Sequence, residues 1–94
     1  MLAIARALMT EPELIMLDEP SLGLAPIIVD EVFELMVSIK KMGVTVFLVE
    51  QMANAALKIS DTAFVLETGK VILSGTSKEV ASDPKVIKAY LGEV

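Results

Sequence analysis

The amino-acid sequence predicts an α/β fold, because short apolar runs typical of strands alternate with segments typical of helices. The run at residues 14–17 is apolar on both faces, which indicates a strand in a parallel sheet covered on both sides, and the β-branched, apolar run at residues 44–49 is the clearest strand. A later pair, at 62–66 and 71–73, flanks the turn at residues 67–70 and predicts an antiparallel hairpin. The predicted order is therefore helix, strand, helix, strand, helix, two strands and two helices.

The helices before the hairpin each carry a local signal. Residues 1–9 are rich in Ala, Leu and Met, and Pro12 then interrupts the helix they predict. Pro26 suits the first position of a longer helix that Gly43 ends, and residues 52–59 predict a short helix after the second strand. The longer helix has an apolar face at helical spacing, formed by Val32, Leu35, Met36 and Ile39.

Two capping signals predict the helices after the hairpin. Thr76-Ser77-Lys78-Glu79 has the form of a capping box, in which the first and fourth side chains satisfy each other's backbone N–H groups. Asp83-Pro84 is suited to the positions that open a last helix, which we expect to end near Gly92.

Composition bounds the class of protein. The chain has 94 residues, enough for one small domain, yet 54% of them are hydrophobic and the mean hydropathy is +0.67. No stretch approaches the roughly 18–20 uncharged apolar residues that span a bilayer. The sequence therefore indicates an interior piece of a protein, whose apolar faces meet something outside these residues.

Charge and residue types exclude several functions. Thirteen acidic residues against eight basic ones give a net charge of −5, which argues against a nucleic-acid partner because phosphates need cationic surface. The chain has no Cys and no His, which excludes disulfides, thiolate or imidazole metal sites and Ser-His-Asp catalysis. Any chemistry must rest on carboxylates, amides and hydroxyls.

A candidate site follows the first apolar strand. Residues 14–19 form a Walker B pattern, an apolar strand that delivers the adjacent carboxylates Asp18 and Glu19 at its C-terminal end, where open α/β sheets bind ligands. Neighbours on an extended chain point in opposite directions, so Asp18 can hold a hydrated Mg²⁺ while Glu19 orients or deprotonates a water. The alternative is a strand followed by a solvated acidic turn.

The order of motifs resembles the ATP-binding-cassette (ABC) ATPases. Residues 18–26 are similar to the Walker B and D-loop segment of that family, and residues 44–51 to its switch strand. Residues 1–8 are similar to the helix after the LSGGQ signature, and residues 69–76 to the C-terminal hairpin. The resemblance implies part of a P-loop NTPase sheet, with parallel Walker B and switch strands, a C-terminal β-hairpin, and helices on the faces.

Two departures from the family pattern narrow the resemblance. The switch residue is Gln51 where the family usually has His, and Ala25 stands where the D-loop usually has Asp. Together with the ending at residues 89–92, they resemble the branch that powers high-affinity uptake of branched-chain amino acids. Gln can donate and accept hydrogen bonds but carries no charge, so the implied role of Gln51 is to contact the γ-phosphate and position the water.

The resemblance also implies cofactors, partners and a location for the complete subunit. Asp18 would serve Mg²⁺, Glu19 the attacking water, and Gln51 the γ-phosphate of ATP. The implied partners are membrane permease subunits and a second ATPase subunit, at the cytoplasmic, inner face of the cell membrane. The D-loop residues implied to contact the second ATPase subunit are Ser21, Leu22, Gly23, Leu24 and Ala25.

The 94 residues contain no Walker A loop, no Q-loop region and no LSGGQ. Gly69-Lys70 is not a P-loop ending, because Phe64 and Val71 stand where that motif needs Gly and Ser or Thr. The resemblance therefore implies that residues 1–94 are the C-terminal portion of one nucleotide-binding domain, and we expect no ATP or Mg²⁺ to bind this chain alone. The alternative is a non-catalytic α/β chain that self-associates as a homo-oligomer.

Self-association is expected from the order of strands in the family sheet. There the Walker A strand lies between the switch strand and the strand expected at 62–66. Without it the sheet would have a gap with unpaired edges, which recruit other chains. The gap would close either by direct pairing of the flanking strands or by pairing with a second copy. We expect the second, because the high hydrophobic fraction leaves apolar faces that closing the gap would not cover.

Overall fold

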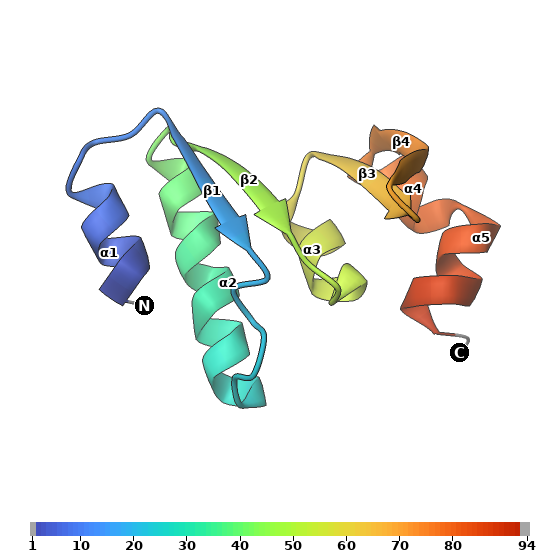
Figure 1. The fold of residues 1–94 in the computed structure, drawn as a ribbon, viewed down its shortest axis with the longest axis horizontal. Helices are drawn as coiled ribbons and strands as arrows, with labels where there is room; N and C mark the ends of the chain where they lie inside the picture. The colour runs from blue at the N-terminus through green and yellow to red at the C-terminus, as the bar shows by residue number, and fades with distance from the viewer. Residues whose placement is uncertain (1, 93–94) are drawn as a thin grey trace. The chain divides into compact units, whose positions relative to one another are not determined.

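The computed structural model describes residues 2–92, which form two compact units (Figure 1). The first unit ends at Gln51 and the second begins at Met52. No helix of the described residues is long and apolar enough to cross a membrane.

The first unit is built on two parallel strands. Helix α1 (Leu2–Leu8) precedes β1 (Leu14–Asp18), and α2 (Pro26–Lys41) connects β1 to β2 (Thr45–Val49). The strands pair in parallel from Leu14 opposite Thr45 to Asp18 opposite Val49. This confirms the predicted parallel arrangement of the Walker B and switch strands and places their C-terminal ends side by side.

Helix α2 packs against β2 and supplies most of the core of the first unit. Pro26 opens the helix as predicted, and Ala25 before it gives no side-chain cap, so only its carbonyl serves the first turn, accepting from the N–H groups of Ile28 and Val29. Of the predicted apolar face, Leu35 is only half-buried. The buried apolar residues of the unit are Ile4, Ile15, Val29, Val32, Phe33, Met36 and Ile39.

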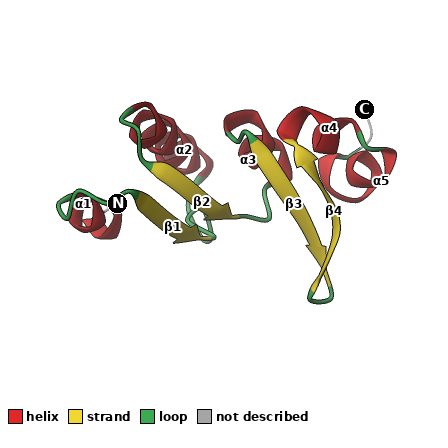
Figure 2. Cartoon of the chain, turned by 90° about the horizontal axis from the view of Figure 1, so that it is seen from above, coloured by secondary structure: helices red, strands yellow, loops and turns green. Residues whose placement is uncertain are grey.

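The predicted burial of β1 on both faces is wrong for the residues that the structure describes. Ile15 is buried, but its neighbours Leu14 and Met16 are exposed, as are Phe47 and Val49 on β2. Helix α2 is the one helix of the described first unit with extensive strand contact, so it covers a single side of the pair (Figure 2). We call the other side, formed by Leu14, Met16, Phe47 and Val49, the open sheet face.

The second unit is a hairpin with short helices. Its elements are α3 (Ala53–Ile59), β3 (Thr62–Glu67), β4 (Lys70–Thr76), α4 (Ser77–Ser82), α5 (Pro84–Val86) and a π-helical turn η1 (Ile87–Leu91). Strands β3 and β4 pair antiparallel as predicted, although β4 is longer than residues 71–73. Thr68 and Gly69 both have positive φ, 51° and 75°, as a two-residue hairpin turn requires. Gly69-Lys70 thus belongs to a turn and not to a phosphate loop.

The predicted capping signals are both present. Thr76 Oγ1 accepts from the N–H of Glu79 at 3.1 Å, and Glu79 Oε1 accepts from the N–H of Thr76 at 3.0 Å. Hydrogen bonds donated to the Glu79 carboxylate, first by the backbone N–H of Thr76 and then by the Thr76 hydroxyl, hold the pKa of this carboxyl below its ordinary value. Asp83 Oδ1 accepts from the N–H of Lys85 at 2.9 Å and opens α5 before Pro84.

Each unit has its own sheet. Within the described residues, β2 pairs with β1 and β3 pairs with β4, and β2 and β3 share no ladder.

Candidate functional site

The candidate site lies at the C-terminal ends of β1 and β2. Asp18 is the last residue of β1 and lies opposite Val49, the last residue of β2. One residue further, the N–H of Glu19 donates to the carbonyl of Val49 at 2.7 Å. The parallel ladder therefore brings the predicted Walker B carboxylates and the switch segment to the same sheet edge.

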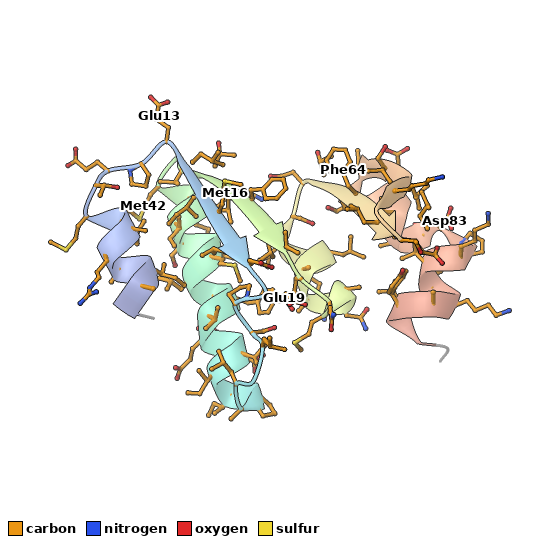
Figure 3. The ribbon with its side chains drawn as sticks, in the orientation of Figure 1. Glu13, Met16, Glu19, Met42, Phe64 and Asp83 are labelled. Carbon is orange, nitrogen blue, oxygen red and sulfur yellow. The ribbon has the colours of Figure 1, made fainter. Side chains whose placement is uncertain are left out.

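Asp18 and Glu19 differ in backbone and in exposure. Asp18 is extended and exposed, whereas Glu19 is half-buried and has a φ of 46°, in the left-handed region (Figure 3). Its carbonyl accepts from the N–H of Leu22 at 3.1 Å, which closes a turn directly after the strand. The two carboxylates are thus placed differently because the chain leaves the strand at Glu19, and not because of alternation along a strand.

Gln51 follows β2 by two residues, and its side chain is exposed. Its backbone N–H donates to Glu50 Oε1 at 3.1 Å, so the half-buried carboxylate before the switch residue holds the main chain of that residue. Glu50 is not among the site residues predicted from the sequence motifs described above. The sequence signal that could have identified it is its spacing. Side chains alternate between the two faces of a strand, so Glu50 lies on the same inward face as Val46 and Leu48.

The D-loop segment, residues 21–25, forms the turn between Glu19 and α2. Ser21 is buried and its carbonyl accepts from the N–H of Leu24 at 3.2 Å, which anchors the turn. Gly23 has a φ of 77° and open space beside it. The other members, Leu22, Leu24 and Ala25, are exposed. Two exposed leucines on an anchored turn are available to another molecule.

The residues at this edge fit a Mg²⁺ that is bound together with phosphate. Magnesium takes one or two protein carboxylates and fills its other positions with water and phosphate oxygens. Asp18 offers one exposed carboxylate, and no group of three or more acidic side chains suited to a metal occurs among the described residues. The residues at this edge therefore fit a hydrated Mg²⁺ held through one protein carboxylate.

Comparisons with known proteins agree with this geometry. A family model described as "Branched-chain amino acid ATP-binding cassette transporter" matches residues 70–94. The chain is 56% identical over 92 residues to the high-affinity branched-chain amino acid transport ATP-binding protein BraG of Pseudomonas aeruginosa. The aligned residues cover 98% of this chain and 40% of that protein. It is also 39% identical over 93 residues to the high-affinity branched-chain amino acid transport ATP-binding protein LivG of Escherichia coli. Those residues cover 98% of this chain and 36% of LivG.

Solved structures share the fold. The ADP conformation of MJ1267, an ATP-binding cassette of an ABC transporter, matches 96% of this chain and 37% of its own, with a TM-score of 0.77 and 37% identity. Clostridium perfringens cbiO1, part of the ABC transporter complex cbiONQ, matches 93% of this chain and 35% of its own, with a TM-score of 0.78 and 38% identity.

These matches span nearly the whole chain but well under half of each relative. The Walker B strand, the D-loop turn, the switch segment and the hairpin occur in the family order and pair as that fold requires. The chain belongs to the branched-chain amino acid branch of the ATP-binding cassette family and corresponds to the C-terminal part of the ATP-binding subunit.

Proposed function

We propose that residues 1–94 are the C-terminal portion of one nucleotide-binding domain, in a subunit that hydrolyses Mg-ATP to drive import of branched-chain amino acids. The observation that carries this proposal is the pairing at the site, where Asp18 lies opposite Val49 and the N–H of Glu19 binds the Val49 carbonyl. That pairing supports a joint role for Asp18, Glu19 and Gln51. Mg²⁺, when bound with ATP, neutralises charge that develops on the phosphates.

The three side chains would divide the work. Asp18, exposed at the strand end, would hold the metal through one carboxylate oxygen. Glu19, half-buried and held by its backbone, would accept a hydrogen bond from the attacking water and take its proton. The exposed amide of Gln51 would donate to a γ-phosphate oxygen and fix the water, without taking part in proton transfer.

The same proposal assigns partners. The exposed D-loop residues Leu22 and Leu24 support a contact with a second ATPase subunit, across which each D-loop would report the state of the other site. The subunit would bind permease subunits at the cytoplasmic face of the membrane. The amino acid or related amide that is carried would be selected by those other subunits.

An ATP titration tests the proposal. The phosphate-binding loop of P-loop enzymes combines backbone N–H groups with a Lys and a Ser or Thr, and the 94 residues contain no such motif. We therefore expect calorimetry to find no Mg-ATP binding to this chain at sub-millimolar nucleotide and no ATPase above background. A micromolar site in the isolated chain that Asp18→Asn abolishes would contradict the proposal.

The positive control is a chimera in which this chain replaces the matching segment of the Pseudomonas aeruginosa relative. The chimera supplies the residues that these 94 lack, so we expect it to bind and hydrolyse Mg-ATP. Asp18→Asn in the chimera should raise the Mg²⁺ concentration needed for half-maximal hydrolysis, because it removes the metal carboxylate. A chimera that folds and binds ATP but never hydrolyses it would overturn the catalytic assignment.

A second function is favoured by the open sheet face, namely self-association of the isolated chain. Leu14, Met16, Phe47 and Val49 are exposed on it, and contiguous apolar surface beside unpaired strand edges promotes association. Light scattering at tens of micromolar protein should therefore report a dimer or a larger species.

Met16→Lys tests which surface is responsible. Burying a methionine stabilises an interface by about 1.5–3 kcal/mol, so a lysine there should raise the dissociation constant by about tenfold or more. Met42→Lys is the matched control, because Met42 is outside the open sheet face and both side chains are 69% exposed (Figure 3). A monomeric wild-type chain, or equal effects of the two substitutions, would rule out association through this face.

A further inference from the structure

We infer that Glu50 is a positioning residue for the switch: its carboxylate fixes the main chain of Gln51 and thereby the reach of the Gln51 amide. The inference rests on the proposed role of Gln51 in ATP hydrolysis. It assigns Glu50 no contact with substrate, so its effect must pass through the residue that it holds.

The location of Glu50 is the first support. Inward and outward side chains alternate along β2, with Val46 and Leu48 half-buried and Phe47 and Val49 exposed. Glu50 continues the inward series and is itself half-buried. A carboxylate on the apolar side of a strand loses hydration and must gain hydrogen bonds in return. Of its two carboxylate oxygens, Oε1 gains such a bond, and Oε2 is buried.

The second support is the bond itself. The ladder between β1 and β2 ends at the pair of Asp18 and Val49, so no strand partner continues beside Gln51. Glu50 Oε1 accepts from the Gln51 N–H at 3.1 Å. This bond supplies the acceptor that a neighbouring strand would otherwise provide. Glu50 thus extends control of the backbone past the end of the sheet, to the residue whose amide has to be aimed.

The alternative role for Glu50, as a third metal carboxylate beside Asp18 and Glu19, lacks support. No group of three acidic side chains that could hold a metal occurs in the described part of the chain. One oxygen of Glu50 is already engaged with the main chain.

A long, flexible side chain such as that of Gln51 contributes to a transition state only when its base is fixed, because small misplacements reduce rates strongly.

Amide hydrogen exchange tests the bond in the ¹⁵N-labelled 94-residue chain. Glu50→Met keeps the length of the side chain but removes the acceptor, whereas Glu50→Gln keeps an acceptor oxygen. We expect the Gln51 amide to exchange about tenfold faster in Glu50→Met, and to stay within about threefold of wild type in Glu50→Gln. The Glu19 amide, bound to Val49, reports whether the strand pair remains folded. Unchanged Gln51 exchange in a folded Glu50→Met chain would overturn the inference.

Turnover in the chimera tests the consequence. Glu50→Met should lower kcat about tenfold and leave the KM for ATP within about twofold, because the bond aims Gln51 for the reaction and does not bind nucleotide. Glu50→Gln should retain most of kcat. In a Gln51→Ala background, Glu50→Met should have no further effect.

The outcomes separate the two claims. Equal losses in Glu50→Gln and Glu50→Met would assign the effect to charge, and an additive loss on Gln51→Ala would show that Glu50 acts independently; either result overturns the positioning role. If Gln51→Ala hydrolyses ATP normally while Glu19→Gln does not, the inference fails and the proposed ATPase function stands. If neither substitution affects turnover, the proposed function itself fails.

Discussion

Glu19→Gln in the chimera is expected to keep ATP binding and to lower turnover by about 10²–10⁴-fold, the usual effect of removing a catalytic base. The substitution preserves the shape of the side chain and its ability to accept a hydrogen bond, so the water can still be held. It removes the basic oxygen that takes the proton. The backbone of Glu19 is fixed by its bond to Val49 and by the turn to Leu22, so the local fold should not change.

The measurements are equilibrium nucleotide binding and steady-state phosphate release on the same preparation. Glu13→Gln is the matched control, because Glu13 is an exposed glutamate at the opposite end of β1, and its carbonyl accepts from the Thr45 N–H (Figure 3). Its loss of charge should leave turnover unchanged. Near-normal turnover in Glu19→Gln, or equal losses in both variants, would remove Glu19 from the mechanism.

Local signals in the sequence predicted most of the elements. The apolar run at 44–49 became β2, Pro26 became the first residue of α2, and the capping box at Thr76 formed as its residue types require. The proline position and the capping box depend on interactions within a few positions of the chain, and the strand was predicted from residue types that favour extended backbone. Such interactions can be predicted from sequence because the partners are close in the chain whatever the tertiary fold is.

Features that depend on distant partners were missed or mistaken. An apolar run indicates that a strand can be buried on both faces, but it does not supply a second layer, and Met16 and Phe47 remain exposed. Alternation along a strand predicted that the side chains of Asp18 and Glu19 point in opposite directions, but the left-handed backbone of Glu19 changes the direction of the chain there. The π-helical turn at Ile87–Leu91 had no local signal that distinguishes it from an α-helix.

At the candidate site, too, the residues in a local motif were predicted and the residue that depends on tertiary structure was missed. Asp18 and Glu19 were found because a motif places two carboxylates next to each other at the end of a strand, and Gln51 was found through the family resemblance. Glu50 went unnoticed because its importance lies in a side-chain bond to the main chain, which depends on which way the strand faces. The alternation along β2 shows which side chains point inward only once it is known which face of the strand the helix covers.

Ile39→Ala is expected to destabilise the first unit by about 2–5 kcal/mol, the usual range for truncating a buried isoleucine. Ile39 is 0% exposed on the face of α2 that forms the core, together with Met36 and Val32. A small core rarely supplies more than about 3–5 kcal/mol in total, so this single change should leave the unit largely unfolded. Urea titration followed by circular dichroism, at a protein concentration where the wild-type midpoint no longer changes, measures the loss.

Ile27→Ala supplies the comparison, because it is the same substitution in the same helix at a side chain that is 70% exposed. Alanine favours the helix at both positions, so the change in helix propensity largely cancels between the two variants. The Ile27 variant should stay within about 0.5 kcal/mol of wild type, as is usual for surface positions. Similar losses at the two sites would mean that α2 does not pack through the face of Ile39. In that case the helix would not hold β1 and β2 together, and the edge that carries Asp18 and Gln51 would need another support.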